Sequence, residues 1–246
     1  MQDCFDKKWP CIFFAFYLHF SCTIQKKAVP LRRKVKICSQ NMAIGWVVAM
    51  VICCGCTAHR ECVEVSDTEK FRDGDMVLRC GMGAESRAVV QRSNSSFSHI
   101  GILQFDSVEG EWMVIHAVPG ESVAGEPEYL KCEPIEAFYS PMRAQRGAWM
   151  RIDCTEETAS RAAAYCRRKA EERVVFDNDY LLSDTTELYC CELVWLAYMR
   201  EGIDISSGGR YEVPTVICKE GECIFPCNIE NGKNTLFVKH FKTKQL

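Results

Sequence analysis

SHIGILQF-DSVEG-EWMVIHAV, residues 98–118, is the stretch of sequence that decides the fold. Its two ends carry the β-branched and aromatic residues typical of strands. The link DSVEG is short enough for a hairpin turn. We therefore predict two antiparallel strands, Ser98–Phe105 and Glu111–Val118. In such a hairpin, His99 would face His116 or its neighbour Ala117, with a bulge at Gly110 adjusting the register.

Two further strands are expected outside this hairpin. DMVLR at Asp75–Arg79 precedes it, and Ala148–Ile152 follows it. Both are short, contain apolar or β-branched residues and are bounded by polar ones. No internal repeat or low-complexity tract is present. The pattern predicts an α+β domain with a small antiparallel sheet packed against helices.

Two helices are predicted after the strands. The first begins at the N-cap Thr155, has Glu156 and Glu157 in its first turn, and ends near Arg173 after several basic residues, as the helix dipole favours. The second begins after residues 184–186 and stops at Gly202, a residue suited to a left-handed C-cap. This assignment places Cys190 in the first turn or two of the second helix.

The composition excludes some classes of protein. The chain has 246 residues, 48% of them hydrophobic, and a formal net charge of −3. This length suits one well-buried domain plus an appendage. The near-neutral charge gives no reason to expect a nucleic-acid partner, because nucleic-acid-binding domains usually carry a basic face. No organic cofactor is indicated.

The sequence contains 17 cysteines, and they do not follow zinc-finger spacing. The nearest candidate is Cys218, Cys223 and Cys227, whose first nearby histidine is His240. A zinc site usually needs four well-spaced donors, so we predict no metal. A disulfide among these three cysteines is expected if the domain is exported, and free buried thiols are the alternative.

Residues 1–56 have the character of a leader. Trp9–Cys22 and Ala43–Gly55 are apolar but shorter than a membrane-spanning helix. The second stretch follows a basic segment and ends in small residues before Cys56, the layout of a secretory signal. Gly55-Cys56 resembles the end of a bacterial lipobox, although Cys53 stands where leucine is usual. We expect export, lipidation of Cys56 and attachment to the membrane of a bacterial cell envelope.

Other interpretations of the leader stay open. Residues 1 to about 30 are consistent with an overlong gene model, since a start near Leu31 would give a compact signal peptide. A membrane-anchoring hairpin of two short helices is the alternative. In either case 57–70 is expected to be a linker, and 71–246 the globular domain.

The thiol chemistry depends on Cys190. A catalytic thiol must be ionised, and a helix N-terminus and a neighbouring imidazole both lower its pKa. Of the five histidines, His19 lies in the leader, and His59 and His240 lie near the ends of the mature chain. His99 and His116 remain as candidates for the base and the residue that orients it.

Three motifs in this order resemble a known family: SHIGI at Ser98–Ile102, VIHA at Val114–Ala117 and YCCELV at Tyr189–Val194. They are similar to the YiiX-type permuted NlpC-like enzymes, which are circularly permuted papain-like proteins. The opening DGD at Asp73–Asp75 is also similar to their first strand. The resemblance covers about Phe71 to Gly202 and implies a circularly permuted papain-like fold with the site between sheet and helices.

The resemblance also implies roles for individual residues. Cys190 matches the nucleophile, His99 the base and His116 the third, orienting position. The YiiX-type enzymes resemble VIEA at this motif, with glutamate at the third place, and histidine there is similar to the lecithin–retinol acyltransferase branch. Cys191 stands where serine is usual and is either inert or a partner for oxidation of Cys190. Tyr189 and Ser98 are the candidates for substrate binding.

The predicted function is therefore a thiol hydrolase. It would cleave an amide, in a cell-wall or other peptide, through a thioacyl intermediate on Cys190. One alternative is a thiol acyl hydrolase or acyltransferase acting on lipid esters or amides, which an apolar cleft would favour and a polar groove would not. The other alternative is a catalytically silent envelope binding module with the same fold.

Overall fold

The computed structural model describes residues 61–122, 125–182, 185–212 and 221–245. By its internal contacts the chain divides into Met1–Cys56 and Thr57–Leu246, and all described residues belong to the second unit. The predicted leader, including Cys56 as the expected lipidation site, thus lies outside the described residues. Within those residues, no helix has the length and apolar character needed to cross a membrane.

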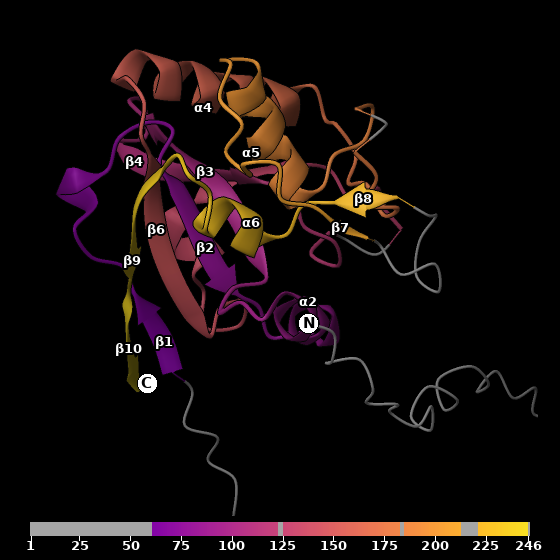
Figure 1. Ribbon diagram of the computed structural model, residues 1–246. Helices are drawn as coiled ribbons and strands as arrows, with labels where there is room; N and C mark the ends of the chain where they lie inside the picture. Colours follow the sequence, from indigo (N-terminus) through magenta and orange to yellow (C-terminus); the bar gives the residue numbers. More distant parts are fainter. Residues whose placement is uncertain (1–60, 123–124, 183–184, 213–220, 246) are drawn as a thin grey trace, which may run out of the picture. The chain divides into compact units, whose positions relative to one another are not determined.

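The described chain contains both strands and helices (Figure 1). Its strands are β1 (Glu61–Glu64), β2 (Met76–Cys80), β3 (His99–Asp106), β4 (Glu111–His116), β5 (Lys131–Pro134), β6 (Arg146–Ile152), β7 (Tyr211–Glu212), β8 (Glu222–Cys223), β9 (Thr235–His240) and β10 (Lys242–Gln245). Its helices are η1 (Thr68–Lys70), α2 (Ala84–Ser93), α3 (Ile135–Phe138), α4 (Glu156–Glu171), α5 (Cys190–Met199) and α6 (Pro226–Glu230).

The central sheet has six strands in the order β5-β4-β3-β2-β6-β9, and every neighbouring pair is antiparallel. Two small two-stranded sheets, β1-β10 and β7-β8, complete the strands. The predicted hairpin is confirmed as β3 and β4, and Gly110 adopts a left-handed φ of 74° in its turn. The mixed helix and antiparallel-sheet class is also as predicted.

Helices α4 and α5 lie side by side over one face of the central sheet (Figure 1). Thr155 caps α4 as predicted, its side chain accepting a hydrogen bond from the backbone N–H of Thr158 at 3.2 Å. Helix α5 begins at Cys190, and Gly202 beyond its end has the expected left-handed φ of 79°. Cys190 is therefore the first residue of its helix.

Alternation along the strands divides the core between the two faces of the sheet. Ile100, Ile102 and Ile115 join the larger cluster, which α4 and α5 cover. Leu103 and Val114 join a second cluster on the opposite face, together with residues of α3 and β1. By the same alternation, His99 and His116 lie on this second face, away from the body of α5.

Two expectations about the rest of the chain differ from the structure. Within 57–70, where a linker was expected, Glu61–Glu64 pairs with β10 as a strand, because Cys62 and Val63 are buried there. Cys223 and Cys227 are free thiols, so no disulfide joins them, and Cys218 lies outside the described residues.

Candidate active site

Cys190 lies at the N-terminus of α5, where the first backbone N–H groups have no partner within the helix. The remainder of α5 packs against β3 on the face opposite the histidines. Cys190 nevertheless reaches His99, because both residues begin their elements at the same end of the sheet. The two side chains interact, and the backbone N–H of Ile100 also interacts with the Cys190 sulfur.

A chain of hydrogen bonds runs from His99 across the sheet. His99 Nε2 lies 2.9 Å from His116 Nδ1, and His116 Nε2 lies 3.1 Å from Glu133 Oε1. These three residues come from β3, β4 and β5, which are neighbours in the sheet. The structure thus brings together Cys190, His99 and His116 and adds Glu133, which the sequence analysis did not identify.

The register of the hairpin differs from the one expected. Ile102 pairs with Ile115, so continuing this register places Gly101, rather than His99, opposite His116. His99 and His116 are therefore diagonal neighbours on one face, within reach because imidazoles are long enough to span the diagonal. A Cβ on Gly101 would lie 2.5 Å from Val114 Cγ1 and 3.2 Å from His116 Cβ. A glycine here leaves the space that His116 occupies.

The hydrogen-bond chain determines which ring nitrogens carry protons. Ionised Glu133 can only accept, so His116 Nε2 must donate to it. In neutral His116, Nδ1 then accepts from His99 Nε2–H. Because Nε2 of His99 is engaged in this way, Nδ1 is the nitrogen that faces Cys190, and it is unprotonated. His99 is thus held in the tautomer that can take a proton from the thiol.

Burial and neighbouring groups shift the pKa values of all four residues. Burial lowers the pKa of His99 to about 4, although the neighbouring Cys190 acts to raise it. Burial also lowers the pKa of His116. Burial would raise the pKa of Glu133, but the hydrogen bond with His116 and the ion pair with Arg143 bring it to about 2. The pKa of Cys190 is lowered well below its usual value by the hydrogen bond with Cys191 and, despite burial, by His99.

Acid is therefore expected to destabilise the fold through His99. In the unfolded chain its pKa is about 6.5, above its folded value, so below pH 6.5 the unfolded state binds the proton first. The free energy of unfolding should fall by about 3 kcal/mol as the pH drops from 6.5 to 4. Urea denaturation at both pH values would measure this loss. An equal loss in His99→Gln would show that His99 is not its source.

Arg79 adds a buried charge beside the histidines. It lies opposite His99 on β2, and its guanidinium stacks on the Phe138 ring at 4.5 Å from the ring centroid. Nη1 donates to the Phe138 carbonyl oxygen at 2.8 Å, and Nη2 pairs with Glu121 Oε1 at 2.6 Å. Glu121 also pairs with Lys131 and Arg143. This network connects through Arg143 to Glu133, the last residue of the hydrogen-bond chain, and holds Glu133 in place.

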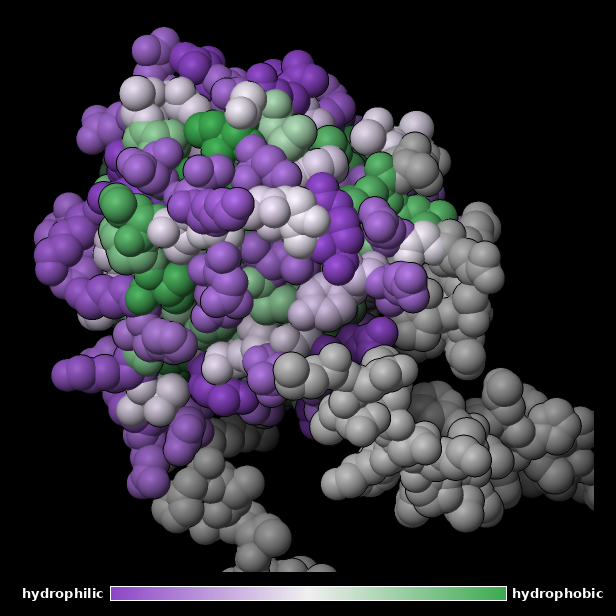
Figure 2. Space-filling view, in the orientation of Figure 1, coloured by the Kyte–Doolittle hydropathy of each residue, from purple (hydrophilic) through white to green (hydrophobic). Residues whose placement is uncertain are grey.

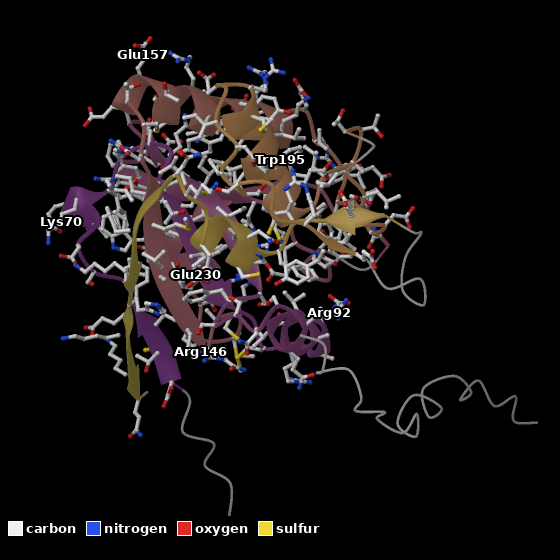
Figure 3. All side chains as sticks on the ribbon, viewed as in Figure 1. Lys70, Arg92, Arg146, Glu157, Trp195 and Glu230 are labelled. Carbon is white, nitrogen blue, oxygen red and sulfur yellow. The ribbon has the colours of Figure 1, made fainter. Side chains whose placement is uncertain are left out.

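A cavity of about 460 Å³ opens onto the candidate site. Cys190, Cys191, His99 and Arg79 contribute to its wall. Most of the other residues that line it are apolar: Met82, Ala84, Val89, Ala117, Val118, Pro119, Met142, Phe176, Tyr180, Ile224, Phe225 and Pro226. In Figure 3, Arg92 on α2 and Glu230 on α6 mark the two helices that border it.

The two predicted substrate-binding residues both line this cavity. The Tyr189 side chain is buried, and its hydroxyl accepts a hydrogen bond from the backbone N–H of Ile224 at 2.8 Å. The hydroxyl of Ser98 accepts from the backbone N–H of Gly81 at 3.0 Å. Both hydroxyls therefore hold the cavity wall together, while their role in binding a substrate stays a prediction.

The outer surface in the view of Figure 2 is mostly hydrophilic, with separate hydrophobic patches. Among the residues that the structure describes, no three or more histidine, cysteine or acidic side chains are grouped so as to hold a metal ion. His240, the nearest histidine to the predicted cysteine group, instead packs against Phe97 at 5.3 Å between ring centroids.

Comparison with known proteins supports the fold alone. No family model matches the chain, and neither does any curated protein. Among solved structures it is similar to the crystal structure of the metalloprotein YiiX from Escherichia coli O157:H7, with a TM-score of 0.53 and 16% sequence identity. The match covers 71% of this chain and 98% of that one. The chain thus has a YiiX-like fold.

Proposed function

We propose that the protein is a cysteine hydrolase with a circularly permuted papain-like active site. The observation that carries this proposal is the hydrogen-bonded series His99, His116 and Glu133, together with Cys190, which interacts with His99 from the N-terminus of α5. It contains a nucleophile, a base, an orienting group and a carboxylate that fixes the tautomers. Each of these roles requires the geometry described above.

In the proposed reaction, His99 Nδ1 takes the proton from Cys190, and the thiolate attacks the carbonyl carbon of the substrate. The backbone N–H of Cys190 helps to stabilise the oxyanion. As the tetrahedral intermediate collapses, the bond to the leaving amine or alcohol breaks, and His99 returns the proton to that group. Water then loses a proton to His99 and attacks the thioester, which releases the acid and regenerates Cys190.

Two substrate classes fit this chemistry. An amide in a cell-wall or other peptide follows from the family resemblance, which is an analogy of fold. A lipid ester or amide, with hydrolysis or transfer of its acyl group, is favoured by one observation: the cavity beside Cys190 is lined mainly by apolar side chains. Predicted lipidation of Cys56 and attachment to a cell envelope would place the enzyme beside such substrates.

YiiX is described as a metalloprotein, but the donors in the site of this chain do not fit a metal ion. His99 Nε2 and His116 Nδ1 point at each other at 2.9 Å, and the other ring nitrogen of His116 is bonded to Glu133. Ligands of a shared ion instead direct their lone pairs to one point about 2 Å from each nitrogen. The proposed reaction therefore uses no metal.

The proposal is tested by labelling the full chain with iodoacetamide at pH 6 under reducing conditions, with peptide mass spectrometry to follow each cysteine. Because its pKa is lowered, Cys190 should react at least about tenfold faster than any other cysteine. His99→Ala should remove this preference. His240→Ala is a matched control, since His240 lies outside the hydrogen-bonded series, and it should retain the preference.

The opposite results would favour the binding-module interpretation. If Cys190 reacted no faster than the other cysteines, it would not be an activated nucleophile. If His99→Ala left its rate unchanged, His99 would not be its base.

If the labelling shows that Cys190 is activated, a panel of peptide and fatty-acyl thioester, ester and amide substrates would separate the two substrate classes.

A further inference from the structure

The side chain next to the proposed nucleophile is a second thiol. Cys191 Sγ lies 3.9 Å from Cys190 Sγ, within the range of a sulfur hydrogen bond. Cys190 and Cys191 are the first two residues of α5, so the helix backbone fixes both Cβ positions. Cys191 is 1% exposed and lies in the wall of the same cavity. The two sulfur atoms are therefore held together with little room to separate.

The positions of Cys190 and Cys191 do not suit a disulfide bond between them. Neighbouring Cα atoms joined by a trans peptide are about 3.8 Å apart. A disulfide usually joins Cα atoms separated by about 4.4–6.8 Å. Oxidation would therefore distort the first turn of α5, which also supplies the backbone N–H groups of the proposed site. The geometry suits two separate sulfur atoms that share a proton.

The environments of the two thiols differ in a way that assigns donor and acceptor. Burial raises the pKa of Cys191, and the approach of Cys190 raises it further. The pKa of Cys190 is lowered by the hydrogen bond with Cys191, by His99 and by the backbone N–H of Ile100. When one of the two sulfur atoms ionises, it is therefore Cys190, and Cys191 keeps its proton.

We propose that the Cys191 S–H group donates a hydrogen bond to the Cys190 thiolate and is a positioning residue for the nucleophile. This inference rests on the proposed function, because it assumes that Cys190 reacts as a thiolate. It replaces the expected roles of Cys191 as an inert residue or as a partner for oxidation. A hydrogen bond to the charged form favours that form, so Cys191 helps to keep Cys190 ionised near neutral pH.

The test is the pH dependence of Cys190 alkylation in the full chain. Cys191→Ala removes the donor, so the midpoint of the profile should rise by about one pH unit and the rate at pH 6 should fall about tenfold. Cys191→Ser keeps a donor and should retain most of the wild-type rate. Cys166→Ala is the matched control: it also truncates a fully buried cysteine that contacts α5, at the Leu193 carbonyl, and should leave the profile unchanged.

Each outcome decides the inference. Cys191→Ala with a wild-type profile, or an equal shift in Cys191→Ala and Cys191→Ser, would overturn the donor role. Denaturation curves verify folding, and Cys191→Val, which fills the space without a donor, replaces the alanine variant if that one unfolds. A wild-type Cys190 with the profile of an ordinary thiol would instead refute the proposed function itself.

Discussion

Glu133→Gln should slow the alkylation of Cys190 at pH 6 about 100-fold. The side chain keeps its size, but Arg143 donates to both oxygens of Glu133, at 2.9 and 2.8 Å. In the glutamine variant, Arg143 would hold the single carbonyl oxygen, and the amide N–H₂ would turn toward His116 Nε2. An N–H₂ group can only donate, so His116 would have to accept through Nε2.

This change would reverse both tautomers. His116 Nδ1 would carry the proton and donate to His99 Nε2, which leaves the proton of His99 on Nδ1, facing Cys190. The imidazole could no longer take the thiol proton. A thiol with an ordinary pKa of about 8.5 is only about 0.3% ionised at pH 6, which would correspond to a loss of about 300-fold. The expected loss is smaller because Nδ1–H of His99 could still donate to a Cys190 thiolate.

The measurement is the same site-resolved alkylation, made across a range of pH. Glu121→Gln is the matched control: Glu121 belongs to the same charge network but bonds to Arg79, Lys131 and Arg143 rather than to His116. It should lower the rate much less. Equal rates in wild type and Glu133→Gln would mean that the carboxylate does not determine the state of His99, and the tautomer argument would be wrong.

The parts of this site that could be predicted from sequence are those carried by local patterns. The β-branched and aromatic residues on either side of the short link DSVEG predict the β3-β4 hairpin, and Thr155 and Gly202 mark helix ends. The rarity of histidine then leaves His99 and His116 as partners for Cys190. These inferences require only neighbours in sequence, or the pairing of strands joined by a short turn.

Other features depend on contacts between distant segments. Glu133 joins the site only because β5 pairs with β4, and the described residues of the connection between them form no strand or helix that would indicate this order. Strand β1 likewise pairs with β10 at the other end of the chain. Such pairings are set by packing of the whole domain, which local propensity does not encode.

The strand register and helix α2 are two further features that could not be predicted from the sequence. The pairing of His116 with Gly101 depends on the space left by a missing side chain, which alternation alone does not reveal. Helix α2 borders the cavity, yet Ser93 is its one buried residue. It therefore lacks the apolar stripe by which an amphipathic helix is recognised in a sequence.

Arg151→Met should destabilise the domain by about 3–5 kcal/mol. Asp75 has a fully buried side chain, and Arg151 binds it through Nε at 2.7 Å and Nη2 at 2.6 Å. Burial raises the pKa of Asp75 even with this partner present. Without the guanidinium, the carboxylate must stay buried without its main ion pair, or take up a proton, and either result weakens the fold.

Thermal unfolding would show this loss as a fall in Tm of about 10 °C, because each kcal/mol shifts the midpoint of a domain of this size by about 2–4 °C. Arg161→Met is the control, since Arg161 forms exposed ion pairs with Glu157 and Glu201 that should contribute little. The double variant Asp75→Leu with Arg151→Met removes both charges and should be more stable than Arg151→Met alone. If the double variant were the less stable of the two, the loss would come from the packing of Arg151 on Trp149 and Phe237 and not from an isolated charge.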